Sequence, residues 1–552
     1  MTIGNLPLFV VGLLLLGAVV PALMPARRRR TRLFIAALAI ALALGAVVDL
    51  AVLAVNGPVT PSLGSVVPGV PLTLRADEPG LTLSIFVLVA ALLSLSAPGR
   101  RSGEEAAVLL TAAGACVAAM AGNAVLLFAG AEIANLGGLL VIRARGGHLG
   151  RGALTAFAIQ HAFGLALLGA AVQLVVARGT SDPYALPPAA LGVAAAFPWG
   201  LAGAASLLAG GWWPGTATDR SPGDWLSVGA VPCGGAILLR LMGGLDGSPD
   251  PGLAIWLSVI GALAAVTGAA AAWRWQVEPP RAARALLVAA AGPVIVMAGL
   301  PGGPGGFVTG LLALELGVLA AATWRRADVT GRGERWLGAL ALAAVGGLPV
   351  GFGTTALVLE LGTVASAGPA YLPLLAVLGA AAALAAAAAL GSARQLLGVP
   401  SPGAGSSRLS LIAAPLVLGV VAALLPGGVA ETVLTGLAGN GAPASVDLMS
   451  VRGPGTSWPG GYLTLALAVL AVGAACTVLV AGRPLPSISP GPPRQRSRPA
   501  WLYLVPLRRS AGPSLRLFGS VLAGADRWLV GQPGLIFAVA TAALAILLTH
   551  FL

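Results

Sequence analysis

The chain has 552 residues, of which 57% are hydrophobic and only 9% are charged. Soluble proteins carry about 25% charged residues, so this composition excludes an ordinary soluble enzyme and indicates a membrane protein. The 32 basic residues give a formal net charge of +13, and all of them are arginine because the sequence contains no lysine. Schiff-base chemistry and lysine proton relays are therefore excluded.

Apolar segments long enough to cross a bilayer, which needs about 20 residues, follow one another along the chain. They predict an all-α polytopic membrane protein of about 16 transmembrane helices. The predicted spans are 6–25, 33–55, 80–97, 106–122, 123–143, 153–177, 189–213, 224–243, 252–273, 282–300, 305–324, 336–367, 370–391, 408–427, 459–482 and 534–551.

Arginines mark alternate loops between these spans. The first loop holds Arg27, Arg28, Arg29, Arg30 and Arg32, and arginines follow every odd-numbered span, whereas even-numbered spans are followed by few. Loops rich in arginine remain in the cytoplasm. The pattern therefore predicts a multi-pass protein of the cell (inner or cytoplasmic) membrane, with its N-terminus outside.

Two predicted spans contain residues that interrupt a straight helix. Breaks at membrane depth occur where the backbone lines a cavity or is buried in protein. The two predicted breaks lie five spans apart, and an odd period reverses the direction of the chain, so we predict two inverted five-helix repeats. The break residues are Pro214 in the seventh span and Gly347, Pro349 and Gly351 in the twelfth.

These features divide the chain into four predicted regions. The last region includes a Pro- and Arg-rich linker at 483–512 and an amphipathic segment at 513–531, which we expect to lie along the membrane surface. The regions are 1–105 with spans 1–3, 106–243 with the first repeat (spans 4–8), 252–391 with the second repeat (spans 9–13), and 408–552 with spans 14–16.

Ionisable side chains inside membrane spans are energetically unfavourable and therefore mark functional sites by default. The predicted spans contain Asp49, Glu132, His161, Glu315 and Glu360. We take the last four as proton-relay candidates, led by Glu132 in the middle of the fifth span. The alternative for each is a structural side chain that is satisfied by a neighbouring hydroxyl or carbonyl group.

Cofactor chemistry is not indicated by the sequence. Cys116, Cys233 and Cys476 lie in separate apolar segments, without the spacing of a metal site or a disulfide framework. No glycine-rich phosphate loop follows a predicted strand. We therefore expect no cofactor and no metal in this chain, and we expect any redox chemistry to lie in partner subunits.

The order of these features resembles a known family. An outer loop ending in Leu72-Thr73-Leu74-Arg75-Ala76-Asp77 precedes the third span, the fifth span carries the central Glu132, and the twelfth carries Gly347-Leu348-Pro349 and then Gly351-Phe352. From about residue 70 to residue 370, this order is similar to that of the antiporter-like subunits of respiratory complex I, membrane-bound NiFe hydrogenases and Mrp cation/proton antiporters. The resemblance implies proton or cation translocation in the lipid bilayer, with other membrane and peripheral subunits as partners and no nucleic acid.

In that family a fifth-span glutamate pairs with a seventh-span lysine, which passes the proton to an eighth-span lysine or histidine and on to the twelfth span. The glutamate falls on Glu132, but the seventh-span lysine falls near Gly203 or Ala204 and the eighth-span base near Pro232. The twelfth-span residue falls near Thr355, with Glu360 more than a turn away, and an eleventh-span histidine of the family falls near Glu315.

The missing bases therefore predict a relay that is impaired, or rerouted through His161, since histidine titrates in the useful range. Two other functions remain open. The chain could be a stand-alone secondary transporter or cation/proton antiporter, which broken helices also favour. It could also be a lipid-linked glycosyltransferase that uses Asp77 and Glu78 in the first outer loop.

Overall fold

The structure is a computed structural model. The described residues are 3–54, 57–67, 70–96, 103–146, 151–182, 197–209, 226–243, 251–300, 304–323, 332–348, 352–398, 446–447, 450–453 and 456–459.

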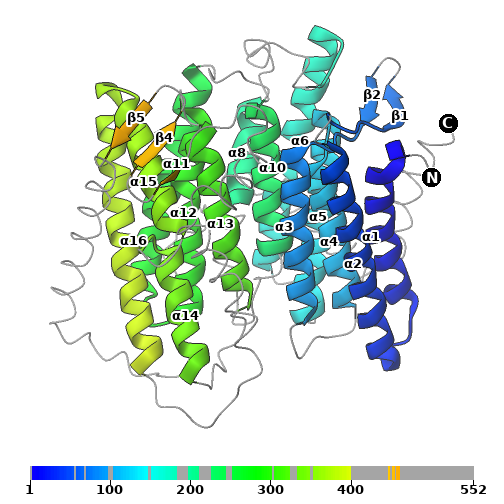
Figure 1. Ribbon diagram of the computed structural model, residues 1–552, viewed down its shortest axis with the longest axis horizontal. Helices are drawn as coiled ribbons and strands as arrows, with labels where there is room; N and C mark the ends of the chain where they lie inside the picture. The colour runs from blue at the N-terminus through cyan, green and yellow to red at the C-terminus, as the bar shows by residue number, and fades with distance from the viewer. Residues whose placement is uncertain are drawn as a thin grey trace.

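Helices make up nearly all of the described chain, and they stand side by side as a bundle (Figure 1). Eight of the described helices are long and apolar enough to cross a membrane. In chain order the helices are α1 (Leu6–Leu23), α2 (Arg29–Ala54), α3 (Glu78–Ser96), α4 (Glu104–Ala119), α5 (Ala124–Gly146), α6 (Arg151–Arg178), α8 (Phe197–Leu208), α10 (Val231–Gly243), α11 (Pro251–Arg274), α12 (Pro279–Gly299), α13 (Pro304–Thr323), α14 (Arg332–Val345), α15 (Phe352–Ser366) and α16 (Leu372–Gly398).

Each of the first thirteen predicted spans coincides with a helix or with a broken helix of this bundle. The π-helical turn η5 (Leu226–Ala230) leads into α10 and completes the eighth span. The fourteenth to sixteenth spans fall at 408–427, 459–482 and 534–551, which lie outside the described residues except for Pro459, and so do the linker and the amphipathic segment. The predicted total of about 16 therefore remains a prediction.

The twelfth span is broken in the structure. Its first half, α14, ends at Val345, and its second half, α15, begins at Phe352. Gly347 has a φ of +75°, a left-handed conformation that glycine adopts without the strain of a side chain. The predicted break residues Pro349, Gly351 and Pro214 lie outside the described residues.

The two predicted repeats share one order of packing. In the first, α4 packs on α5, α5 on α6, α6 on α8 and α8 on α10, and the same order runs through α11, α12, α13, the broken α14 and α15, and α16. Glycines bring the first two helices of each group together, since a Cβ at Gly114 would contact the backbone of α5 and a Cβ at Gly268 would contact the backbone of α12. Helices that follow one another in sequence also pack together in bundles without repeats, so the two repeats and their inverted relation remain predictions.

Two small β-sheets lie in segments that the sequence predicted as loops between spans. β1 (Ser62–Val67) and β2 (Val70–Thr73) form an antiparallel hairpin before α3. Three short strands, β3 (Val446–Asp447), β4 (Ser450–Gly453) and β5 (Thr456–Pro459), form a second antiparallel sheet. Both sheets lie at the same end of the bundle (Figure 1), which we call the hairpin end.

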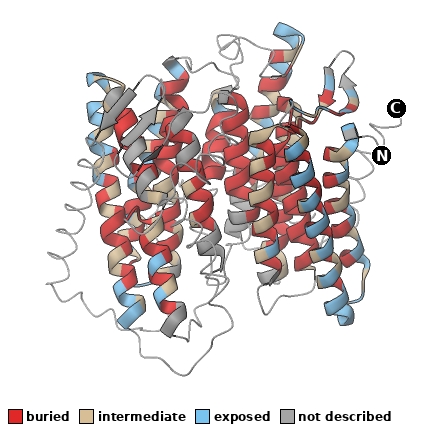
Figure 2. Ribbon diagram, in the orientation of Figure 1, coloured by how far each residue is buried: buried red, intermediate tan, exposed pale blue. Residues whose placement is uncertain are grey.

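Burial follows the expected pattern of a helix bundle in lipid. The facing sides of the helices are buried and the outer sides of the peripheral helices are exposed (Figure 2). Large apolar side chains are exposed on α2, α6 and α11, such as Val52 at 68%, Val176 at 82% and Ile255 at 66%. Such surfaces suit the acyl chains of a bilayer rather than water.

Candidate functional site: a carboxylate–imidazole pair in the first repeat

Glu132 and His161 form a hydrogen-bonded pair between α5 and α6. The distance from His161 Nδ1 to Glu132 Oε2 is 2.6 Å. Both side chains are largely withdrawn from the surface, with 17% of Glu132 and 29% of His161 exposed. A short bond between an acid and an imidazole in a low-dielectric site allows one proton to reside on either group.

Neighbouring residues of α6 shape the space around this pair. Gly164 leaves room for the acid, because a Cβ at this position would lie against Glu132 Oε1. The Phe157 ring, one turn before His161, is parallel to the imidazole within 2°, with ring centroids 6.1 Å apart. Gly164 therefore leaves space for the carboxyl group, and the Phe157 ring lies alongside the imidazole. Glu132 Oε1 has no hydrogen-bond partner among the described residues.

The position that would correspond to the seventh-span lysine is filled by α6. A Cβ at Gly203 of α8 would lie 2.5 Å from the Phe163 Cβ, closer than real Cβ atoms approach. The buried Gln160 amide donates a hydrogen bond to the Gly203 carbonyl oxygen, at 3.2 Å. At Gly203 the packing of α6 on α8 therefore leaves no space for a side chain, and Ala204, the other candidate position, is buried with 1% exposed.

Glu315 lies in α13 and is almost completely buried, with 1% exposed. Its Oε1 has no hydrogen-bond partner among the described residues. The acid lies close enough to the buried Cys233 thiol of α10 for the two groups to interact electrostatically. Because α10 belongs to the first repeat and α13 to the second, Glu315 lies at the junction of the two.

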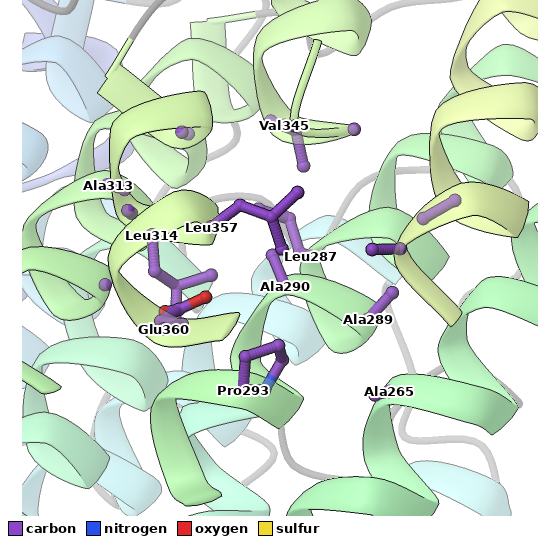
Figure 3. A pocket seen from close by; sticks show the side chains of 18 of the residues that line it. Ala265, Leu287, Ala289, Ala290, Pro293, Ala313, Leu314, Val345, Leu357 and Glu360 are labelled. Atoms are coloured by element: carbon purple, nitrogen blue, oxygen red, sulfur yellow. The ribbon is translucent and has the colours of Figure 1, made fainter. Parts of the chain in front are cut away.

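Glu360 lies in α15 and borders a cavity of about 60 Å³ next to the helix break (Figure 3). The lining is otherwise apolar and includes Pro293 of α12 and Leu357 of α15, together with Gly347 at the break. A Cβ at Gly310 of α13 would contact Glu360 Oε1, so that glycine leaves room for the carboxyl group. The cavity is large enough for a few water molecules beside the acid.

The structure therefore brings Glu132 and His161 into contact and places Glu315 and Glu360 at separate positions in the second repeat. Asp49 is exposed on α2 and takes no part in these contacts. Among the described residues, no group of three or more histidine, cysteine, aspartate or glutamate side chains is arranged to hold a metal ion.

Sequence reasoning missed a second cluster, at the hairpin end, which we call the Arg240 clamp. The guanidinium of Arg240, only 1% exposed, binds both carboxylate oxygens of Asp77 at 2.5 and 2.7 Å. It also donates to the carbonyl oxygens of Arg75 and Ala119. Arg75 Nε donates to Asp77 as well, at 3.0 Å. The clamp joins the start of α3 and the end of α4 to α10.

The Asp77 carboxyl group is kept ionised by these partners. Burial acts to raise its pKa, but the Arg240 guanidinium and the hydrogen bonds from Arg240, Gly80 and Arg75 outweigh burial, so the pKa of Asp77 lies below its ordinary value. One sequence signal could have revealed the clamp. Arg240 is an arginine near the end of an even-numbered span, on the side of the membrane where loop arginines are few.

No family model matches the amino-acid sequence, and no curated protein matches it.

Solved structures do resemble the chain. A chain of the Mrp complex from a Dietzia species superimposes with a TM-score of 0.69 at 20% identity, over 98% of this chain and 63% of that one. This chain therefore spans less than two thirds of that protein's length. A chain of the membrane-bound sulfane sulfur reductase, an archaeal respiratory membrane complex, gives a TM-score of 0.67 at 17% identity, over 98% and 99% of the two chains.

A chain of respiratory complex I from Thermus thermophilus gives a TM-score of 0.57 at 22% identity, over 77% of this chain and 98% of that one. At such identities the likeness establishes the fold and leaves the function to be argued from the site. The chain has the polytopic helical fold of the antiporter-like membrane subunits to which its sequence was found similar.

Proposed function

We propose that this protein is a proton- or cation-translocating membrane subunit of a multisubunit complex, with a relay that is rerouted through His161. The observation that carries the proposal is the 2.6 Å bond between Glu132 and His161. It gives the buried acid a titratable partner in a protein without lysine. A carboxyl group and an imidazole can each carry a proton, so the pair supplies a donor and an acceptor in direct contact.

The closed position at Gly203 supports the rerouted path. A relay through α8 needs a long basic side chain there, and Phe163 occupies that space. The acid of α5 instead reaches α6 directly. Beyond the pair, Glu315 at the junction and Glu360 beside its cavity are the buried acids of the second repeat, and we propose them as later stations of the same path.

The glycosyltransferase alternative receives no support from the geometry of Asp77. Both of its carboxylate oxygens are bound by Arg240, and one also accepts a bond from Arg75. A carboxylate that is held in this way is a poor ligand for a substrate or a metal ion. We therefore propose a structural role for Asp77.

The experiment compares His161→Leu with the unmodified protein in proteoliposomes, with proton flux followed by an entrapped pH dye. Removal of a positioned proton carrier lowers the rate of proton transfer by about 100-fold or more. Ala162→Leu is the matched control, because it adds the same side chain at the neighbouring exposed position of α6. Gly164→Ala tests the pair without changing either member, since its methyl group would displace Glu132 Oε1, and it should also lower the flux.

Two results would contradict the proposal. Flux that is unchanged in His161→Leu would remove His161 from the path. Absence of flux in the unmodified protein would favour a structural subunit. Cation-dependent flux by the purified single chain would instead favour the stand-alone transporter.

A further inference from the structure

The hairpin end of the first repeat is closed by a continuous set of contacts. After β2 the chain pairs with the segment before β1 at the Val59–Ala76 bridge and with the turn between α4 and α5 at the Leu74–Ala121 bridge. The backbone N–H of Arg75 donates to the Met120 carbonyl oxygen. This backbone layer covers the ends of α3 and α4, and the Arg240 side chain lies directly beneath it.

The three charged side chains of the clamp lie at different depths. Arg75 is 29% exposed, Asp77 is 13% exposed and Arg240 is 1% exposed, so the guanidinium is the innermost charge. A Cβ at Gly80 would contact Arg240 Nη2 and the Ala119 carbonyl oxygen, so only glycine permits this close approach. Two arginines and one carboxylate make up the clamp, so it carries a net positive charge, and the Arg240 guanidinium is the innermost part of it.

A short buried polar series lies on the interior side of the guanidinium. Ser84 Oγ donates to the Gly80 carbonyl oxygen at 2.7 Å, and Cys116 lies one turn before Met120 on α4, which packs against α3. Both side chains are completely buried. A cation that entered from the hairpin end along α3 and α4 would have to pass Arg240 before it reached Cys116.

The opposite end of α4 is held differently. Arg32 and Glu105 are both buried there, but their closest charged atoms are 3.9 Å apart. Neither carboxylate oxygen of Glu105 has a hydrogen-bond partner among the described residues. The two ends of the first repeat thus differ, with close multidentate binding at the hairpin end and a looser ion pair at the other.

We propose that the Arg240 clamp is a cation-excluding seal that closes the hairpin end of the first repeat. The net positive charge of the clamp repels protons and metal cations, because little water is present around the buried guanidinium to screen it. The interior acids of the first repeat then exchange with solvent by a route other than the gap between α3, α4 and α10. The seal does not depend on whether the protein conducts protons.

Cys116 is a native reporter for this seal. In a Cys233→Ser/Cys476→Ser background it is the remaining thiol of the chain, and Ag⁺ is a small cation that binds thiols. Silver is added only to the hairpin face of oriented, sealed vesicles in chloride-free buffer. The protein is then denatured, and the thiol that remains alkylatable is measured by mass spectrometry.

The variants separate a seal made by charge from one made by structural integrity alone. Arg240→Gln removes the positive charge at position 240. Asp77→Asn and Arg240→Lys disturb the same ion pair but retain that positive charge. We expect Cys116 to become reactive in Arg240→Gln and to stay protected in the parent, in Asp77→Asn and in Arg240→Lys. Arg281→Gln, which breaks the exposed Glu278–Arg281 pair, is the control and should stay protected. All variants are first checked for monodispersity.

Three outcomes would overturn the proposal. The first is a parent protein in which Cys116 already reacts from the hairpin face. The second is an Arg240→Gln variant that stays as protected as the parent. The third is equal reactivity in Arg240→Gln, Asp77→Asn and Arg240→Lys, which would mean that the integrity of the ion pair, and not the charge, closes this end.

Discussion

At the scale of single residues, two uses of basic side chains stand out in a chain without lysine. One is the use of histidine beside a buried acid, with His161 bound to Glu132 at 2.6 Å. The other is the use of a buried arginine as a fixed charge, with Arg240 bound to Asp77. Arginine keeps its proton at any physiological pH, so it can anchor and exclude but cannot relay. Under the proposed function, the histidine carries protons and the arginine stabilises the structure.

Asp77→Asn should destabilise the protein. The substitution leaves a buried guanidinium without its counter-ion, and breaking a buried pair in this way lowers the free energy of unfolding by about 3–5 kcal/mol. Denaturation of the purified protein in detergent measures the change. The surface pair offers a comparison, because Arg281→Gln should lower the same free energy by at most about 1 kcal/mol. Equal effects of the two substitutions would contradict the role given to the clamp.

The same pair has a defined pH dependence. The pKa of Asp77 is lower in the folded protein than its ordinary value, so its contribution to stability is present above that ordinary value and is lost as the pH falls through the lower, folded pKa. The stability difference between the parent and Asp77→Asn should therefore be constant from about pH 5 to pH 8 and should shrink only below about pH 4. A difference that declined already near neutrality would exclude an ionised Asp77 as its source.

At the scale of elements, the broken helix is the feature that sequence reasoning located best. Glycine and proline together cannot continue a helix, and the turn falls at Gly347 with a φ of +75°. The cavity beside the break depends on several helices and could not be predicted from the local sequence. It is lined from α12, α13, α15 and α16 as well, and the carboxyl group that borders it lies two turns into α15.

Gly347→Ala should weaken the break without filling the cavity. A side chain in the left-handed region is disfavoured by about 1–2 kcal/mol, and the new Cβ would also lie 3.2 Å from Leu357 Cδ2. We expect a lower midpoint of thermal unfolding, measured in detergent by circular dichroism. Gly12→Ala is the matched control, because a Cβ at Gly12 meets nothing within 4 Å and alanine favours the helix. A loss of stability as large in the control would show that the effect is not specific to the break.

At the scale of the whole molecule, the alternation of arginines predicts which end of the bundle faces the cytoplasm. The hairpin end should lie outside, because Arg27 to Arg30 lie at the other end, between α1 and α2. In a background without native cysteines, Ser62→Cys in β1 should react with an impermeant maleimide in intact cells. Arg30→Cys should react only after the cells are permeabilised. The opposite labelling would reverse the predicted topology, and both positions are exposed.

The sequence by itself determined where the helices lie that coincide with the first thirteen predicted spans, and where the twelfth is broken. These properties depend on local composition, namely apolar length and the inability of glycine and proline to continue a helix. It also identified Glu132 and His161, because ionisable residues are rare in membrane spans and can be recognised in the sequence alone.

Only the tertiary structure decided which of these groups meet. Glu132 and His161 are 29 residues apart and Asp77 and Arg240 are 163 residues apart, so their contacts depend on how α5 packs on α6 and how α10 packs against α3 and α4. The closed position at Gly203 is of the same kind, because the atoms that fill it belong to Phe163 on another helix. Close packing of helices depends on which small residues face one another. The contacts between polar side chains therefore form only when the helices are assembled.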